Sequence, residues 1–188
     1  MKTIMLAWFC CGCLCVQAGR VSVLNLSDTE TVRVELRTGG KLLKMELKPC
    51  AESGTLAPEG ETTDVVAVYD GKETKVPTPI AGAGSVVVLR VTKDGLASKV
   101  LPSKPSAGSL AVRVCNLTSE KVAVRVNSRA VEVPASGEVS VAGVQGRELK
   151  WSVADVAEDN YPLEEPCAVI IFLWRVGDAW RGHCFGDY

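Results

Sequence analysis

Apolar and polar residues alternate along short segments throughout this chain, and no segment of useful length has a helical period. Alternation with a period of two places every second side chain on the same face of a β-strand. Segments such as "VSV" at Val21, "VRV" at Val32 and "VAVRV" at Val122 follow this pattern. Residues typical of turns, mainly Gly, Pro, Asn and Asp, separate them. The pattern therefore predicts an all-β protein.

The alternating segments occur twice in the same order. "VSVLNLS" begins at Val21 and "VRVCNLT" at Val112, and each continues into "VRV", a turn and another alternating strand. Each half then reaches a long apolar strand, "SVVVLRV" or "CAVIIFLW". A hairpin signal follows each of these strands, "DG" at Asp94 and "GD" at Gly177. We therefore predict two related domains, each with roughly six or seven short strands.

A segment rich in Pro, Ser and Gly, "LPSKPSAGS" at residues 101–109, separates the two halves and is typical of a linker. The predicted fold is two tandem β-sandwiches of immunoglobulin-like or related topology. The first domain is expected at residues 19–100 and the second at 110–188. A single larger sandwich or barrel is the competing arrangement.

The first 18 residues have the features of an export signal. A short positive start, "MK", precedes an apolar stretch too short to span a bilayer as a mature helix, and "VQA" ends in a small residue at Ala18. We expect cleavage there and a periplasmic or extracellular protein. Because no second long apolar run follows, no membrane span is expected in the mature chain.

Charge and composition exclude several functional classes. Lys and Arg number 21 against 22 Asp and Glu, without a basic stripe, so a nucleic-acid partner is not expected. The glycine-rich "AGAGS" at Ala81 precedes a strand, whereas phosphate-binding loops follow one. The acidic residues between Asp155 and Glu165 match no calcium loop and are interpreted as a solvated loop. Neither a cofactor nor a metal is expected.

Eight cysteines are present, and the first four leave with the signal segment. Cys50, Cys115, Cys167 and Cys184 remain, an even number that suggests disulfides in an exported protein. In the last hairpin, Cys184 lies opposite Ile170 or Ile171, about 10–13 Å along the strand from Cys167, too far for a disulfide. Cys115 is therefore expected to pair with Cys167 or Cys184. Cys50 would bridge to the second domain, bond another chain or stay free.

The single histidine, His183, is the only candidate base for a cysteine nucleophile. Its neighbour Cys184 would point to the opposite face of a strand, so the two side chains could not meet directly. Zinc ligation by His183 and three cysteines lacks the short Cys-x-x-Cys spacing of most zinc sites. An enzyme with a cysteine nucleophile assisted by His183 is the alternative function, and no catalytic residue is predicted.

Asn25 and Asn116 stand at equivalent positions of the repeat, each followed by Leu and then Ser or Thr. Both match the acceptor sequence for N-glycosylation. Both also fall where an alternating strand ends, and Asn side chains bond the backbone at such corners. Because the repeat conserves the position, we interpret the two residues as structural corners.

Aromatic residues concentrate in the second half, where seven of the ten lie between Trp151 and Tyr188. A three-residue loop in the last hairpin would place Trp174 opposite Trp180, whereas a two-residue loop would put them on opposite faces. The paired arrangement would form a platform for a sugar ring or a protein partner, so Trp174, Trp180 and Tyr161 are candidate ligand-binding residues. The strand "CAVIIFLW" is apolar at every position, which predicts that both of its faces are covered.

The second half also resembles small exported β-sandwich repeats in its "Val-Arg-Val" strand, corner Asn and "Pro-x-Gly" turn. The matching residues are Val112, Arg113, Val114, Asn116, Val124, Val126, Pro134 and Gly137. The chain is similar to a bacterial extracytoplasmic sandwich domain without known activity, and to the periplasmic accessory protein of alginate O-acetylation. The resemblance implies a role accessory to exopolysaccharide modification or cell-envelope assembly. With the pattern above, we expect an exported non-catalytic binding or adaptor protein with a protein or polysaccharide partner.

Overall fold

The computed structural model describes residues 19–38, 40–58, 62–80, 84–104, 111–142, 144, 148–154, 156–163 and 168–187. The predicted signal peptide, most of the predicted linker and Cys167 lie outside these residues. The described residues contain no helix, and their strands form four sheets of four strands each, which confirms the all-β prediction. Within the described part, no helix is long and apolar enough to cross a membrane.

The first domain is a sandwich of two sheets with the strand orders β4-β1-β7-β8 and β3-β2-β5-β6. Its strands are β1 (Val21–Asn25), β2 (Val32–Thr38), β3 (Lys41–Leu47), β4 (Ala51–Leu56), β5 (Thr62–Tyr69), β6 (Lys72–Pro79), β7 (Ser85–Thr92) and β8 (Gly95–Pro102). β8 therefore extends into the first residues of the predicted linker.

The second domain repeats this architecture with the strand orders β12-β9-β15-β16 and β11-β10-β13-β14. Its strands are β9 (Ala111–Asn116), β10 (Val122–Val126), β11 (Arg129–Val133), β12 (Glu138–Val141), β13 (Glu148–Val153), β14 (Val156–Pro162), β15 (Ala168–Val176) and β16 (Ala179–Asp187). Adding eight to any strand number of the first domain gives its counterpart in the second. The internal repeat seen in the sequence is thus a repeat of topology.

One parallel pairing defines each copy of the fold. β1 runs parallel to β7, and β9 runs parallel to β15, while the other strand pairs are antiparallel. The first strand of each domain therefore lies beside the long apolar strand that comes near its end. Hydrogen bonds continue each parallel pair past the corner, from Leu26 N to Leu89 O in one domain and from Leu117 N to Leu173 O in the other, both at 2.8 Å.

Each domain has its own apolar core between its two sheets. The first core contains mainly Val and Leu side chains, and the second also holds Trp151. The fully buried members of the first include Val21, Val23, Val34, Leu36, Val65 and Leu89, and those of the second include Val114, Val126, Leu149, Val153, Val169 and Ile171. Two separate cores are incompatible with a single larger sandwich or barrel.

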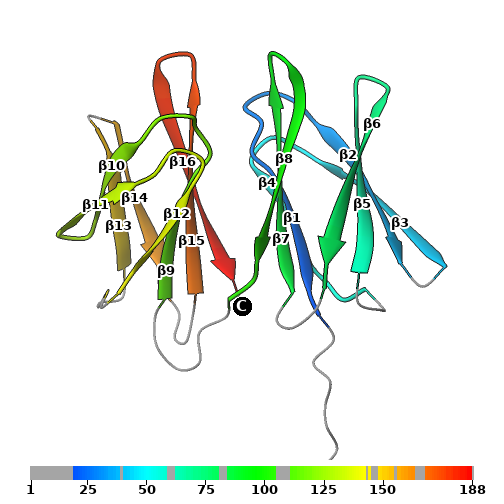
Figure 1. Cartoon of the computed structure of the whole chain (residues 1–188), viewed down its shortest axis with the longest axis horizontal. Helices are drawn as coiled ribbons and strands as arrows, with labels where there is room; N and C mark the ends of the chain where they lie inside the picture. Colours follow the sequence, from blue (N-terminus) through cyan, green and yellow to red (C-terminus); the bar gives the residue numbers. More distant parts are fainter. Residues whose placement is uncertain are drawn as a thin grey trace, which may run out of the picture.

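A third apolar cluster lies between the domains, and we call it the interdomain layer. The first domain contributes Leu24, Leu26, Val86, Val88 and Leu101, and the second contributes Cys115, Ile170, Phe172, Trp174 and Phe185. The sheet containing β1 and β7 faces the sheet containing β9 and β15, so the four sheets lie side by side as four layers (Figure 1). Burial of this layer removes apolar area from water and holds the domains together.

The fully apolar strand β15 follows from this arrangement. Val169, Ile171 and Leu173 face the core of the second domain, while Ile170, Phe172 and Trp174 face the interdomain layer. All six are buried. The sequence-based prediction that both faces of this strand are covered is confirmed, and the cover on the second face is the other domain of the same chain.

The two repeated asparagines close equivalent corners. The side-chain amide of Asn25 donates to the carbonyls of Glu30, Leu47 and Lys48 at 2.8–3.1 Å, and its Oδ1 accepts from the Ser27 amide.

Asn116 makes the equivalent set of bonds, to the carbonyls of Glu120 and Pro134 and from Thr118. Both asparagines are fully buried. Each Nδ2 is thus enclosed and bonded to backbone carbonyls, which are the corner contacts that the sequence predicted.

The cysteine pairing expected from the sequence is wrong for Cys115 and Cys184. Cys115 is in register with Phe172 and faces the interdomain layer, whereas Cys184 is in register with Ile171 and faces the core of the second domain. The two side chains lie on opposite faces of one sheet and cannot join. Across the described residues, which include Cys50 as an exposed thiol, no disulfide is present. Cys167 lies outside these residues.

The last hairpin has a two-residue loop, since Val176 pairs with Ala179. Trp174 consequently lies opposite Arg181, and Trp180 lies opposite Arg175. The paired Trp174–Trp180 platform, one of the two arrangements left open by the sequence, does not form. The tight "GD" turn decides this, because changing the loop by one residue moves the second tryptophan to the other face of the sheet.

Candidate binding site between the domains

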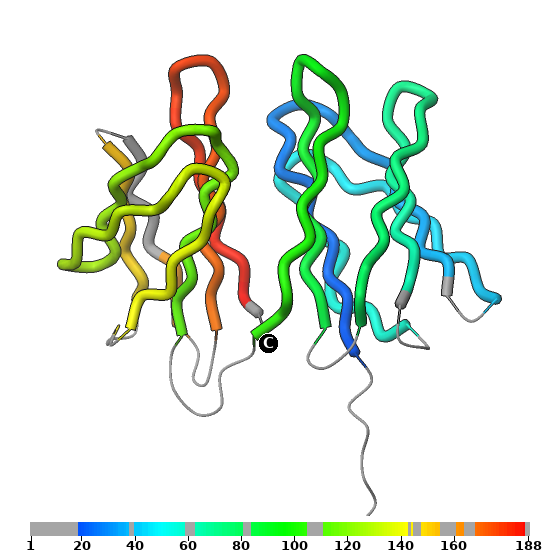
Figure 2. Tube along the Cα trace, viewed as in Figure 1, coloured from blue at the N-terminus to red at the C-terminus, as the bar shows by residue number. Residues whose placement is uncertain are grey.

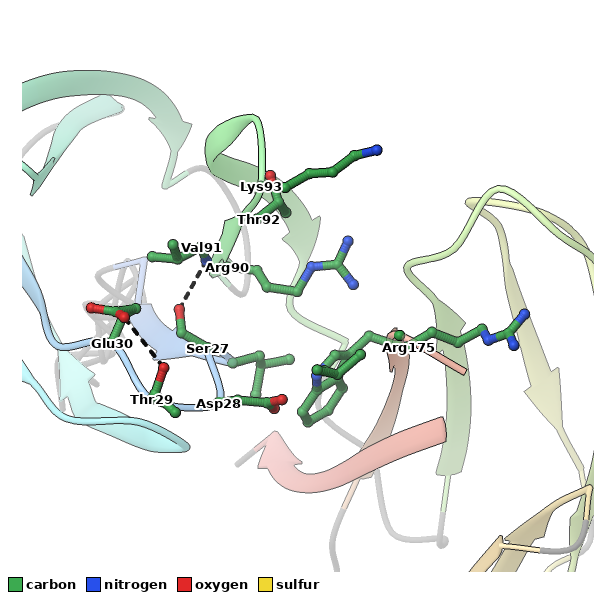
Figure 3. A pocket seen from close by; sticks show the side chains of 13 residues that line it. Ser27, Asp28, Thr29, Glu30, Arg90, Val91, Thr92, Lys93 and Arg175 are labelled. Atoms are coloured by element: carbon green, nitrogen blue, oxygen red, sulfur yellow. Dashed lines mark hydrogen bonds between the residues drawn. The ribbon is translucent and has the colours of Figure 1, made fainter. Parts of the chain in front are cut away.

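A cleft of about 470 Å³ opens between the two domains at one end of the interdomain layer (Figure 3). Three segments line it: the β1–β2 loop, the end of β7 and the end of β15. The lining residues are Leu26, Ser27, Asp28, Thr29, Glu30, Arg90, Val91, Thr92, Lys93, Trp174, Arg175, Val176 and Gly177. Figure 2 shows the β7–β8 and β15–β16 hairpins standing side by side at this end of the molecule.

The β1–β2 loop is fixed in place by the corner that precedes it. The Ser27 amide donates to Asn25 Oδ1 at 3.1 Å, and Ser27 Oγ accepts the Val91 amide at 2.8 Å. The first bond ties the loop to its own strand end, and the second ties it to the neighbouring strand β7 of the same sheet. The corner residue thus positions the wall that carries Asp28.

Arg90 is a half-buried cation in the lining of the cleft. Alternation along β7 puts Arg90 in line with Val86 and Val88, so its side chain continues the interdomain layer to its edge. Burial lowers the pKa of the Arg90 guanidinium, and the neighbouring Asp28 carboxylate offsets part of that effect. Arg90 also lines a second hollow of about 150 Å³ with Lys99, Leu117 and other residues.

Within the described residues, no acceptor lies within hydrogen-bonding distance of Arg90, and no carboxylate lies within 4.0 Å of it. Asp28 and Lys93 likewise have no hydrogen bond or ion pair with any described side chain. Arg90 extends toward the side of the second domain, with the Asp28 carboxylate below it (Figure 3). The cleft therefore presents unpaired groups of both charges.

Arg175, by contrast, already has partners. Its guanidinium lies 3.3 Å from Glu120 Oε2 and 3.5 Å from Asp178 Oδ1, and 5.6 Å above the centre of the Trp180 ring. It points away from Arg90 (Figure 3). These contacts engage its two terminal nitrogens, so Arg175 shapes the second wall of the cleft, although its buried Nε has no hydrogen-bond partner among the described residues.

Trp174 forms the base of the cleft and is only 2% exposed. Its ring packs in the interdomain layer, and its Nε1–H is buried without a hydrogen-bond acceptor in the part of the chain that the structure describes. A buried donor without an acceptor is costly, and such a group commonly marks a place for a water or a ligand oxygen.

Arg90 and Trp174 are equivalent residues of the two repeats. Leu89 is in register with Asn25, and Leu173 is in register with Asn116, so the next residue along each strand occupies the same place in its domain. The end of the interdomain layer is therefore built from one position used twice, with a cation from one domain and an indole from the other. Because the two repeats carry different residues at this position, the cleft is lined by both a cationic and an aromatic side chain.

Of the three aromatic residues predicted to bind a ligand, Trp174 lines the cleft. Trp180 and Tyr161 are partly buried against the core of the second domain instead. The sequence-based prediction missed Asp28 and Arg90. The available signal was positional, because Asp28 closely follows the first corner Asn and Arg90 ends the apolar run of β7.

Cys115, one candidate nucleophile of the alternative cysteine enzyme, does not meet His183. His183 and Cys115 are both in register with Phe172 of β15, one on each side of it. They share a face but are separated by two strand spacings, about 10 Å, with the Phe172 side chain between them. Among the described residues, which exclude Cys167, no group of three or more His, Cys, Asp or Glu side chains is placed to hold a metal ion.

Comparison of the chain with protein-family models and with curated proteins gives no match. The chemistry of the cleft is therefore the ground on which a function is proposed.

Proposed function

We propose that this chain is a non-catalytic binding protein that holds its ligand or partner in the cleft between its two sandwiches. The observation that carries the proposal is the cleft itself, lined by Arg90 and Asp28, which have no ion-pair or hydrogen-bond partner among the described side chains, and by the buried Trp174. Its volume of about 470 Å³ falls in the range of ligand pockets, and its lining combines apolar side chains with a few polar groups. The interdomain layer supports the proposal, because a ligand would meet two walls that are already packed together.

The setting proposed for this activity is the periplasm or the cell exterior, on the grounds of the predicted export signal. A protein or a polysaccharide is the partner, and the resemblance to exported sandwich proteins makes cell-envelope assembly or exopolysaccharide modification the concrete context to test.

Binding can be tested with a blocked cleft. Val176 lines the cleft and is 42% exposed, so Val176→Trp adds bulk at its mouth with little effect on folding. Leu43→Trp is a matched control, because Leu43 is 46% exposed and lies on β3 of the first domain, away from the cleft. Panels of peptides and oligosaccharides are titrated by calorimetry into the mature protein and both variants.

We expect a ligand that binds wild type and Leu43→Trp equally and binds Val176→Trp at least roughly tenfold more weakly. The proposal is overturned if no member of either panel binds wild type, or if the blocked variant binds as tightly as the control.

A further inference from the structure

We infer that the cleft recognises an acidic peptide segment, with a ligand carboxylate on Arg90 and a neighbouring apolar side chain against the mouth of the cleft. This inference rests on the proposed function and names the ligand class of the same site. It begins from Arg90, a half-buried guanidinium with no acceptor in the described part of the chain. Taking a cation out of water is unfavourable unless it is paired, and a carboxylate matches the two-pronged geometry of a guanidinium.

The remaining polar groups favour a peptide over a simple anion. Asp28 beside Arg90 would repel a lone anion, but it can accept a backbone N–H. Lys93 at the rim adds a second unpaired cation. A peptide carries N–H donors, carbonyl acceptors and a side-chain carboxylate within one short segment, which suits this mixture.

The burial of Trp174 argues against a sugar ring. Carbohydrate sites commonly offer an exposed aromatic face for stacking, whereas Trp174 is 2% exposed and its ring is packed in the interdomain layer. The accessible apolar surface of the cleft is aliphatic instead, since Val176 is 42% exposed. An aliphatic side chain at the mouth suits a Leu or Val side chain placed next to the acidic residue.

The probes are N-acetylated tetrapeptide amides with one Asp or Glu beside Leu or Val, and the same peptides with Asn or Gln in place of the acid. A trisaccharide of hexuronic acid and free acetate form two further arms, which present a carboxylate without a peptide. Affinities are measured by calorimetry at low and high salt. Arg90→Met removes the cation and keeps most of the side-chain length, and Arg125→Met is the control at an exposed arginine of β10. Thermal unfolding verifies that both variants are folded.

We expect wild type and Arg125→Met to prefer the acidic peptide over its amide counterpart by roughly tenfold or more, a preference that salt weakens. Arg90→Met should bind both peptides with nearly equal affinity. The inference is overturned, and the proposed function survives, if peptides bind without regard to charge, if Arg90→Met keeps the preference, or if the hexuronic acid trisaccharide or acetate binds and the peptides do not. If none of these probes binds wild type, the inference is overturned; if no member of the earlier panels binds either, the proposed function is overturned as well.

Discussion

Gly182 of β16 lies directly against the indole ring of Trp151 of β13, and a Cβ built at Gly182 would be 1.9 Å from Cη2 of the ring. A strand glycine often marks a place where another group approaches the backbone closely. The large ring fills the core of the second domain because this strand offers no side chain there.

Gly182→Ala is therefore expected to destabilise the protein by about 1–3 kcal/mol, because the added methyl overlaps a packed ring. The free energy of unfolding is measured by urea denaturation. Trp151→Phe removes the ring atoms that clash. Gly182→Ala should therefore lower the free energy of unfolding by less in the Trp151→Phe variant than in wild type. An equal loss of stability in wild type and in Trp151→Phe would contradict the close packing of Gly182 on Trp151.

Asn116→Ala should destabilise the second domain by at least roughly 1–3 kcal/mol, since it leaves the carbonyls of Glu120 and Pro134 and the Thr118 amide without their partner. Asn116→Asp is the matched control: its oxygen still accepts from Thr118, but it cannot donate to the carbonyls while ionised. We expect the Asn116→Asp variant to be less stable than wild type as well. A wild-type stability for Asn116→Ala would show that the corner contributes little.

The buried state of both corner asparagines also predicts the absence of sugar. Expressed in a host that glycosylates exported chains, folded protein should have an intact mass without glycan at Asn25 or Asn116, because each side-chain nitrogen is enclosed and bonded. Intact-mass spectrometry before and after treatment with a deglycosylating enzyme measures this. Detection of a glycan at either site in folded protein would oppose the prediction.

The ion pairs of Glu35 with Lys44 and Arg37 predict that the protein loses stability in acid. Hydrogen bonds from Lys44 and Arg37, at 2.9 and 3.3 Å, hold the pKa of Glu35 below the ordinary value of 4.5. Because the folded state favours the charged form, its contribution is present above pH 4.5 and is lost as the pH falls through the lower folded pKa.

Urea unfolding between about pH 3 and pH 7 should show a shallower acid loss for Glu35→Gln than for wild type. Glu73→Gln, at an exposed position of β6 on the same sheet, is the control and should keep the wild-type slope. Parallel slopes for Glu35→Gln and wild type would contradict the role of the ion pairs.

Thiol labelling tests the interdomain layer. Burial raises the pKa of both thiols, but Cys50 is exposed, whereas Cys115 is fully buried between the domains. Iodoacetamide should therefore modify Cys50 long before Cys115 in the native protein, as peptide mass spectrometry can follow. Phe172→Ala, which removes a large side chain from the layer, should speed the labelling of Cys115. Equal rates at Cys50 and Cys115 in wild type would mean that the domains are not packed as described.

The alternation of apolar and polar residues within single strands was sufficient to predict much of the fold. The alternation of "VSVLNLS" and "VRVCNLT" predicted strands, and their repetition predicted two domains, because a period of two is a property of a single strand. The corner role of Asn25 and Asn116 was also accessible, since each bonds the backbone at the end of its own strand. The apolar run before Trp174 predicted a strand covered on both faces.

The cleft could not be predicted in this way. Asp28, Arg90 and Trp174 come from three segments that meet only when the two domains pack, and each is an ordinary strand-end residue in the sequence. The pairing of Cys115 with Cys184, one of the two expected for Cys115, failed for the same reason. It required the register of β9 on β15, which puts the two thiols on opposite faces of the sheet.

The sequence by itself thus determined the strands, the repeat and the corners, because these depend on side-chain periodicity and on hydrogen bonds made by one repeat. Only the tertiary structure decided which apolar faces meet between the domains, and hence that Arg90 and Trp174, one repeat position used twice, line the same cleft. Burial of apolar area is non-directional, so hydrophobicity marks the faces that must be covered without naming what covers them.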